Sequence, residues 1–287
     1  MAPLLRSTDI SPLARLIRRV DAASDGEAAG DSFATGFPSI DKQLGGGARR
    51  GDLIVLGGEA ASGKSSLALA MALRMAQAGT QTAFFTHEMS VDRVMERALA
   101  IEGRARIDEI RQGSLNEMTR AAVGATAVRL RDRAPIFETF PAGGTDWLGD
   151  ALRRSLDLQV AFVDPLQALA PGARSMDEEL ATAVRDLKTL ARDLNVVVVV
   201  TTNLGAVASG RADPRPTIDD FGALGAVKQH ADIVLGIYRE EMFAPSTGVE
   251  GATELLIRKN RNGSTGYVDL YFYKQWLRFE DMLDPDR

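Results

Sequence analysis

Eight consecutive residues, Gly-Glu-Ala-Ala-Ser-Gly-Lys-Ser at positions 58–65, have the spacing of a phosphate-binding loop, G-x-x-x-x-G-K-[ST]. Glycines at this spacing let backbone N–H groups curl around phosphate oxygens. The lysine can reach the β- and γ-phosphates of a nucleotide, and the serine hydroxyl can ligate Mg²⁺. The residues expected to contact nucleotide are Gly58, Glu59, Ala60, Ala61, Ser62, Gly63, Lys64, Ser65 and Ser66.

The residues on either side of this loop support the same interpretation. Before it, residues 53–56 form an apolar run of the length of a buried parallel strand. After it, residues 66–73 are mostly good helix formers. A helix that starts at the loop points the positive end of its dipole at bound phosphate. The sequence therefore predicts a nucleotide-binding site that uses Mg²⁺.

A second acidic group is needed to hold the metal, and Asp164 stands where one is expected. It follows the apolar run 160–163, which is typical of a buried strand. In an α/β sheet the ends of parallel strands face the ligand crevice. We therefore expect Asp164 beside Lys64 and Ser65, as the second metal ligand.

Hydrolysis also requires a group that orients and deprotonates the attacking water. Glu88 follows another apolar run, 83–86, and is the candidate base, whereas His87 is expected to be a hydrogen-bonded structural residue. Thr202 and Asn203 follow a third apolar run and are candidates to sense the γ-phosphate.

These residues must be positioned by an alternation of strands and helices, which predicts an α/β fold with a mostly parallel sheet. Strands are predicted near 53–57, 82–86, 135–139, 160–164, 196–202 and 232–238, and helices near 64–78, 91–102, 115–132, 146–156 and 177–194. Residues 253–259 and 267–273 flank Asn262-Gly263 and predict a C-terminal hairpin, with a last strand near 276–280. Residues 1–34 predict a short helical arm and linker, and residues 35–287 one domain.

The composition narrows the class of protein. The chain has 287 residues, no cysteine and a net charge of −5. The absence of cysteine excludes disulfides and thiolate chemistry, and no apolar stretch is long enough to span a membrane. A cytoplasmic location is the expectation. The acidic balance provides no general attraction to nucleic acid, so DNA binding would need a local basic patch.

Several separated motifs resemble the DnaB-type hexameric helicases, the RecA-like ATPases of helicase superfamily 4. They are Thr35-Gly36-Phe37-Pro38-Ser39-Ile40-Asp41, Gly51-Asp52-Leu53, Phe84-Phe85-Thr86-His87-Glu88-Met89-Ser90, Val163-Asp164-Pro165-Leu166-Gln167, and the run from Lys259 to Gly266. The resemblance extends in order from about residue 35 to residue 272. It implies a RecA-like core that binds ATP and Mg²⁺ in a ring or filament of identical subunits, a hexamer in this family, and acts on single-stranded DNA with replication proteins as partners.

The resemblance also implies roles for two further parts of the chain. Lys259 and Arg261 would be fingers that enter the neighbouring subunit's site, although by themselves they read as two cations in a solvated turn. The segment from Leu13 to Val20 has one apolar stripe and stands where the family has a linker helix that packs on the adjacent subunit. The arm is therefore expected to take part in assembly.

The sequence departs from the family pattern in the segment that contacts the DNA backbone in that family. An Arg-Glu pair expected shortly before Gln229-His230-Ala231-Asp232 is replaced by Gly222 and Ala223, and Asp219 and Asp220 lie beside them. We expect Gly222→Arg with Ala223→Glu to restore the clamp and raise the affinity for DNA if the channel geometry is otherwise that of the family. Cations that could compensate are Arg174, Arg211, Arg215 and Lys228.

Two functions remain open on the sequence. The chain is either a DNA-translocating motor core, or a DnaB-like ATPase that does not unwind DNA and uses its nucleotide state to control assembly or a protein partner. Stimulation of ATP hydrolysis by DNA would distinguish the two functions.

Overall fold

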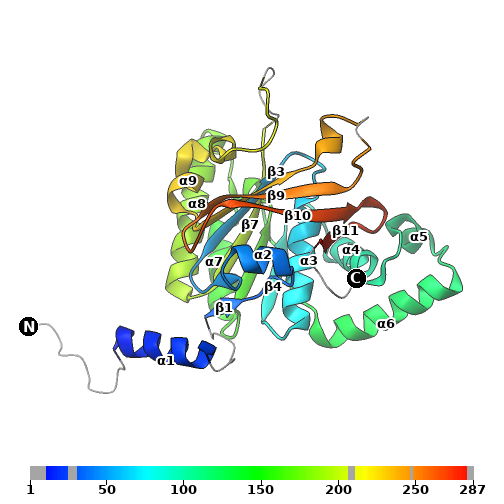
Figure 1. The fold of residues 1–287 in the computed structure, drawn as a ribbon, viewed down its shortest axis with the longest axis horizontal. Coiled ribbons are helices and arrows are strands. Elements are labelled where there is room, and N and C mark those ends of the chain that lie inside the picture. The colour runs from blue at the N-terminus through cyan, green and yellow to red at the C-terminus, as the bar shows by residue number, and fades with distance from the viewer. Residues whose placement is uncertain (1–10, 25–30, 206–210, 246–247, 283–287) are drawn as a thin grey trace, which may run out of the picture. The chain divides into compact units, whose positions relative to one another are not determined.

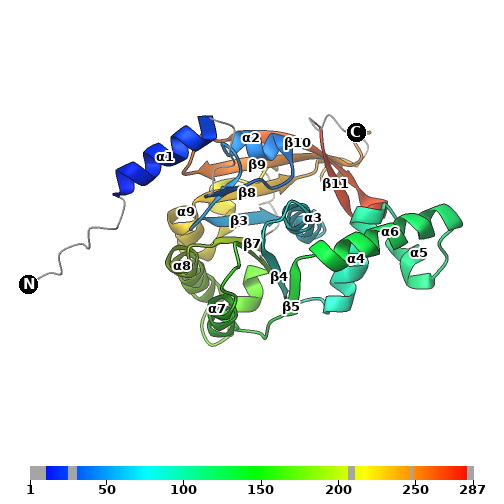
Figure 2. The ribbon, with the colours of Figure 1, turned by 90° about the horizontal axis from the view of Figure 1, so that it is seen from below.

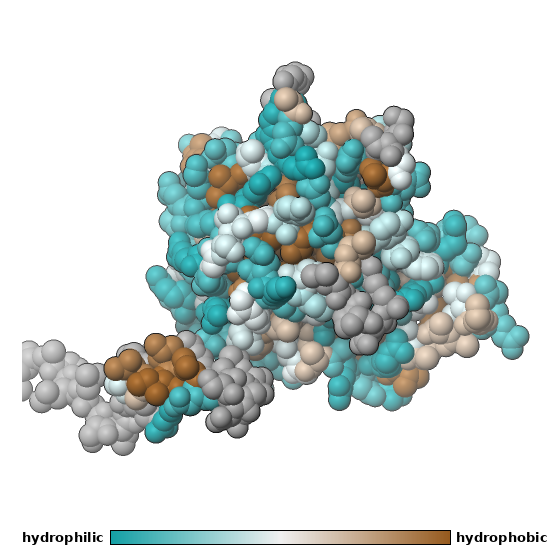
Figure 3. All heavy atoms as spheres, in the orientation of Figure 1, coloured by the Kyte–Doolittle hydropathy of each residue, from teal (hydrophilic) through white to brown (hydrophobic). Residues whose placement is uncertain are grey.

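The computed structural model describes residues 11–24, 31–205, 211–245 and 248–282 (Figure 1). It separates into two units, Met1–Ser32 and Phe33–Arg287. In the first unit, α1 (Pro12–Ser24) is preceded by Ser11, whose Oγ accepts a hydrogen bond from the backbone N–H of Ala14 at 3.2 Å. The apolar stripe predicted for this helix is exposed, and Figure 3 shows apolar side chains gathered on α1.

The second unit is organised around one nine-stranded sheet. In spatial order its strands are β11 (Arg278–Asp281), β10 (Gly266–Tyr273), β9 (Ala252–Asn260), β8 (Ile233–Tyr238), β3 (Leu53–Gly58), β7 (Val197–Asn203), β6 (Val160–Asp164), β4 (Thr82–Thr86) and β5 (Ile136–Thr139). The strands from β8 to β5 are parallel, and β9, β10 and β11 pair antiparallel. The α/β fold, the mostly parallel sheet and the C-terminal hairpin predicted from the sequence are confirmed.

Helices cover both faces of this sheet (Figure 2). The helices of this unit are α2 (Pro38–Gln43), α3 (Lys64–Gln77), α4 (Val91–Gly103), α5 (Ile107–Gln112), α6 (Glu117–Arg133), α7 (Thr145–Arg154), α8 (Met176–Leu194) and α9 (Ala226–His230), and α5 packs on α4 rather than on the sheet. The strands β1 (Ser32–Phe33) and β2 (Ala48–Arg49) form a separate small sheet. One core lies between the sheet, α3 and α4, and the other between the sheet, α7 and α8. No described helix is long and apolar enough to cross a bilayer.

The register of the parallel strands brings the predicted chemical residues to one edge. Gly58 at the end of β3 pairs with Asn203 at the end of β7, and Thr86 of β4 pairs with Asp164 of β6. The strand interiors are fully buried, so these carboxyl ends are where polar groups can meet a ligand.

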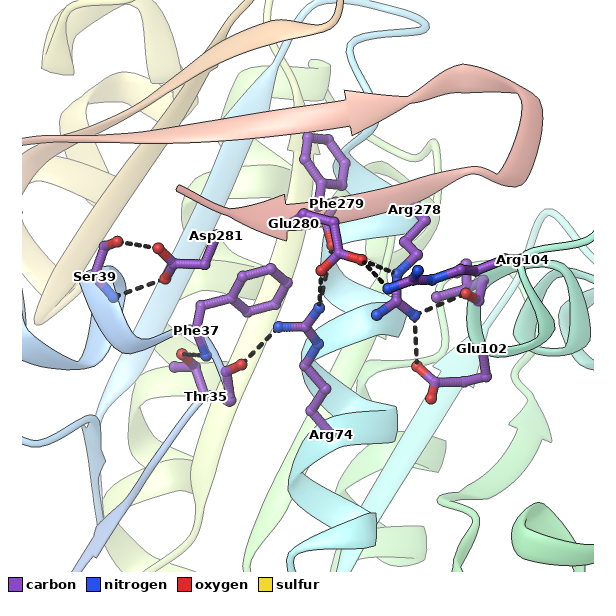
Figure 4. Close-up of polar contacts among 12 residues, drawn as sticks. Thr35, Phe37, Ser39, Arg74, Glu102, Arg104, Arg278, Phe279, Glu280 and Asp281 are labelled. Carbon is purple, nitrogen blue, oxygen red and sulfur yellow. Dashed lines mark hydrogen bonds and ion pairs between the residues drawn. The ribbon is translucent and has the colours of Figure 1, made fainter. Parts of the chain in front are cut away.

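A buried ionic cluster fastens β11 to the helices that follow the phosphate loop and Glu88 (Figure 4). The Glu280 carboxylate is paired with Arg74 of α3 at 3.2 Å, with Arg104 at the end of α4 at 3.2 Å, and with Arg278 of its own strand. Arg74 also lies over the ring of Phe37, 3.9 Å from its centroid. The last strand therefore helps to fix the helices on which the candidate site is built.

Removing this carboxylate is expected to destabilise the fold. Glu280 is 5% exposed, and Arg74 has no other ion pair among the described residues, so Glu280→Ala leaves this largely buried guanidinium without its carboxylate, at a cost on the order of 3–5 kcal/mol in the free energy of unfolding. Urea unfolding of parent and variant would measure it. Glu138→Ala, which removes an exposed carboxylate on β5, is the control and should change little.

From the same ionic cluster we expect the stability of the fold to depend on pH. Burial raises the pKa of Glu280, but hydrogen bonds and charges from Arg278, Arg74 and Arg104 outweigh it and leave the pKa below the ordinary value of 4.5. A carboxyl whose pKa is lower in the folded state stabilises the fold at pH values above its unfolded-state pKa. This contribution to stability is lost as the pH falls through the folded-state pKa. The melting temperature of the parent should therefore fall more steeply below about pH 4.5 than that of Glu280→Ala. Parallel slopes would contradict this role.

Candidate nucleotide site

The phosphate loop turns sharply between β3 and α3. Gly63 caps α3 with φ of 102°, a left-handed conformation that glycine adopts without strain. Lys64 is 7% exposed, and its Nζ donates to the backbone carbonyl of Glu59 at 2.7 Å. Burial lowers the pKa of Lys64, and the charges of Asp164, Glu88 and Glu59 oppose this shift. The ammonium is therefore held against the loop, among carboxylates.

A cavity of about 680 Å³ opens beside the loop. It is lined by Ala60, Ala61, Gly63, Lys64, Ser65, Ser66, Glu88, Arg97, Asp164, Pro165, Thr201, Asn203, Arg239, Met242, Phe272, Lys274 and Leu277. The lining thus brings together the predicted cation, hydroxyl and both carboxylates from α3, β6 and the segment after β4. Gly58, Glu59 and Ser62 belong to the same loop but are not among the lining residues.

Asp164 has the surroundings of a metal ligand. Its Oδ1 accepts hydrogen bonds from Ser65 Oγ at 3.0 Å and from Thr201 Oγ1. Its Oδ2 is buried and has no hydrogen-bond partner among the described residues. Burial raises the pKa of this carboxyl, with the hydrogen bonds from Thr201 and Ser65 and the charge of Lys64 opposing. An unpaired carboxylate oxygen next to a serine hydroxyl fits Mg²⁺, which prefers oxygen ligands.

Glu88 and His87 differ as expected. Glu88 is exposed and lines the cavity. The Nδ1–H of His87 donates to the carbonyl of Phe140 at 2.8 Å, and its backbone N–H donates to the carbonyl of Asp164 at 3.0 Å. His87 therefore joins β4 to its neighbours, and Glu88 remains the group open to a ligand.

The two sensor candidates lie on opposite faces of β7. Asn203 lines the cavity, whereas Thr202 is buried and its Oγ1 accepts a hydrogen bond from Gln167 Nε2 at 2.9 Å. Alternation along a strand separates neighbouring side chains in this way. Of the two, Asn203 can meet a bound phosphate.

Among the cavity residues that were not predicted from the sequence, three polar ones have informative contacts. Arg97 of α4 lies on the same helical side as buried Val94 and Ala98, and its Nε is buried with no hydrogen-bond partner in the described chain. Arg239, which follows β8, donates to the carbonyl of Ala61 at 3.2 Å. Thr201 contacts Asp164. For Arg97 a signal existed, since a cation on the apolar side of a helix needs a partner.

The two finger candidates lie at the other end of the sheet. Lys259 is the last but one residue of β9 and pairs with Val234 near the start of β8, and Arg261 follows the end of β9. The phosphate loop follows the opposite end of β3, which is parallel to β8. Neither cation lines the cavity of its own chain. Any role in catalysis would have to be played in the site of another subunit.

Most of the candidate DNA-binding cations already have acidic partners. Arg211 pairs with Asp220 at 2.8 Å, Arg215 with Glu254 at 2.5 Å, and Lys228 with Asp219 at 2.9 Å. The fourth, Arg174, donates its backbone N–H to the Glu179 carboxylate at 2.6 Å. Asp219 and Asp220 thus neutralise neighbouring cations rather than standing alone.

The segment where the family carries its Arg-Glu pair has an uncommon backbone. Positive φ values occur at Gly222 (60°), Ala223 (51°), Leu224 (50°) and Gly225 (78°). With ψ of −136°, Gly222 occupies a region that side chains disfavour, so Gly222→Arg would strain this backbone, and its effect on DNA binding stays a prediction. Leu224 is 66% exposed and offers a better position for a cation.

Comparisons with known proteins agree with this geometry. Residues 32–281 match the family model described as "DnaB-like helicase C terminal domain". The chain is 30% identical to the replicative DNA helicase DnaB of Pasteurella multocida over 283 residues, 95% of this chain and 60% of the relative. It is 29% identical to replicative DNA helicase DnaC of Bacillus subtilis over 255 residues, 86% of this chain and 56% of the relative.

Two solved structures share the fold. One, described as an ATPase domain, aligns with a TM-score of 0.82 at 23% identity, covering 96% of this chain and 100% of that one. A DnaB-like replicative helicase studied with its interactions with primase aligns with a TM-score of 0.82 at 22% identity, covering 96% of this chain and 67% of that one. The chain spans 56–60% of the length of the curated relatives above. By the match over residues 32–281, it belongs to the DnaB-like helicase C-terminal domain family.

Proposed function

We propose that this chain is a Mg²⁺-dependent ATPase whose sites are completed by a neighbouring subunit. The observation that carries the proposal is the cavity that unites Lys64, Ser65, Glu88 and Asp164. A phosphate loop, a metal-binding acid and a water-activating acid are the parts that ATP hydrolysis requires.

Each residue has one task in this proposal. The loop amides and Lys64 bind the β- and γ-phosphates, and Ser65 with Asp164 holds Mg²⁺, which when bound offsets phosphate charge. Glu88 orients the attacking water and accepts its proton. Arg97 and Asn203 line the same cavity and would contact the phosphates of the bound nucleotide. Arg239, which lies 4.7 Å from the centroid of the Phe272 ring, lines the cavity together with that ring.

The proposed assembly of identical subunits, a hexameric ring by family resemblance, is supported by the position of the fingers and by two exposed apolar rows. On α1 the row consists of Leu13, Leu16, Ile17 and Val20. On the outer side of α6 it consists of Met118, Ala121, Ala122, Ala125 and Val128. Both rows have the spacing of a helix-packing face, and exposed rows of this kind mark interaction surfaces.

Disrupting the first row is expected to shift the protein to smaller species. Leu16→Asp with Ile17→Asp places charges in a stripe that should be buried between subunits. Multi-angle light scattering, with and without ATP and Mg²⁺, measures the mass distribution. Asp21→Ala on the same helix is the control. A double variant that assembles like the parent would exclude α1 as an assembly element.

Between the two functions left open, the ion pairs favour an ATPase only weakly coupled to single-stranded DNA. Phosphate contacts dominate affinity for nucleic acid, and they need cations that are free to make them. Arg211, Arg215 and Lys228 are each paired within the subunit. A nucleotide-dependent regulator of assembly or of a protein partner is therefore the form of the proposal that we favour over an efficient translocating motor.

This form predicts weak, salt-sensitive binding of single-stranded DNA and little stimulation of hydrolysis. Leu224→Arg should strengthen DNA binding and steepen the slope of log affinity against log salt concentration by about one, whereas Leu224→Gln should change neither. The measurements are DNA affinity and ATPase rate against single-stranded DNA at low and moderate salt. Strong stimulation of the parent at moderate salt would restore the motor function to first place.

A further inference from the structure

Asp232, which precedes β8, is a buried carboxylate that the proposed chemistry does not use. It is 2% exposed. Its Oδ2 accepts from the backbone N–H of Leu53 at 2.8 Å and from Lys188 Nζ of α8 at 2.6 Å. Its Oδ1 lies 3.1 Å from NH1 of Arg261. One carboxylate therefore joins the central strand, a helix and a candidate finger.

The backbone around Asp232 also fixes the finger segment. The N–H of Arg261 donates to the carbonyl of Asp232 at 2.8 Å. Lys259 Nζ donates to the carbonyls of Lys228 at 2.7 Å and Ala231 at 2.5 Å, at the end of α9. Both cations are thus anchored on the short stretch that joins α9 to β8.

The arrangement holds Arg261 without covering it. Its side chain is 53% exposed although NH1 is paired with Asp232 and NH2 donates to the carbonyl of Gln229 at 3.4 Å. A guanidinium has five N–H donors in a rigid plane, so a carboxylate on one side fixes the direction in which the others point. Catalysis by a positioned charge depends strongly on this direction, and a shift of about 1 Å can cost about 100-fold in rate.

We propose that Asp232 is a positioning residue for Arg261, and that it orients the guanidinium toward the nucleotide site of the adjacent subunit. This rests on the proposed function, because it requires Arg261 to act in trans. A purely structural role predicts something different. Loss of the contacts to Leu53 and Lys188 would harm the fold or assembly of the subunit that carries the substitution, not turnover at its neighbour.

Mixed assemblies separate the two roles. Full-length Lys64→Ala subunits lack a working nucleotide site but keep their fingers, and Arg261→Ala subunits keep the site but lack the finger. In a mixture, hydrolysis occurs at interfaces where Arg261 of a Lys64→Ala subunit enters the nucleotide site of an Arg261→Ala subunit. Asp232→Asn is then added to the Lys64→Ala subunit, so the active sites themselves are unchanged.

We expect Asp232→Asn to lower the kcat of the mixture by about 10- to 100-fold, with an unchanged KM for ATP and an unchanged mass by light scattering. Lys188→Gln, which changes the other partner of the same carboxylate, and Asp186→Asn, an exposed acid on α8, are the matched controls and should leave the rate within about twofold. If Asp232→Asn subunits do not co-assemble, Asp232→Glu keeps the charge, moves it by one methylene, and should also lower kcat.

The outcomes are distinguishable. An inactive mixture before Asp232 is changed, despite co-assembly, overturns action in trans and this inference with it. An active mixture that Asp232→Asn leaves unchanged overturns the positioning role alone. An equal loss with Lys188→Gln also overturns it, because the effect would then come from the packing of the carboxylate.

Discussion

Glu88→Gln should retain ATP binding and lose turnover by about 10²- to 10⁴-fold. The side chain lines the cavity and is exposed to its contents, so the amide should fit without disturbing the fold. It cannot accept the proton of the attacking water. Steady-state hydrolysis together with binding of a fluorescent ATP analogue would separate the two effects.

The control for this prediction is Glu138→Gln, because Glu138 is an exposed glutamate that does not line the cavity. It should hydrolyse ATP like the parent. Parent-like turnover in Glu88→Gln would show that another group activates the water, and weak ATP binding by the variant would place Glu88 in binding rather than in catalysis.

Lys64→Ala should abolish ATP binding and therefore hydrolysis. Lys64 is the loop cation, it is buried, and its ammonium lies against the loop carbonyl of Glu59. Without it, the β- and γ-phosphates lose the charge placed to meet them. A ligand that binds only the folded state raises its stability, so ATP with Mg²⁺ should raise the melting temperature of the parent but not of the variant. An equal shift in both proteins would contradict the assignment.

Much of the fold could be predicted because its central strands are buried on both faces. Such strands are nearly continuous apolar runs, as 160–163 and 197–200 are, and their lengths and spacing fix the alternation with helices. The same logic placed Glu88 and Asp164, since each follows an apolar run that ends at the ligand edge. The short helices α2, α5 and α9 were missed because six residues or fewer provide little periodic signal.

Other parts of the site depend on contacts between distant segments. Arg239 reaches the phosphate loop only because β8 lies beside β3, and Phe272 because the hairpin folds back over the same region. The pairing of Arg211 with Asp220 and of Lys228 with Asp219 depends on side-chain geometry, so a count of charges overestimates the cations available to DNA. The backbone conformation of Gly222 likewise could not be predicted from the sequence.

Completion of each nucleotide site by a neighbour's Arg261 is the central claim, and co-assembly of Lys64→Ala with Arg261→Ala subunits tests it most directly. Each variant alone should hydrolyse ATP at background rate, because one lacks the site and the other lacks the finger. The mixture should regain activity in proportion to the interfaces that join an intact site to an intact finger. A mixture that shares one mass distribution by light scattering, yet hydrolyses no faster than its separate components, would contradict the claim.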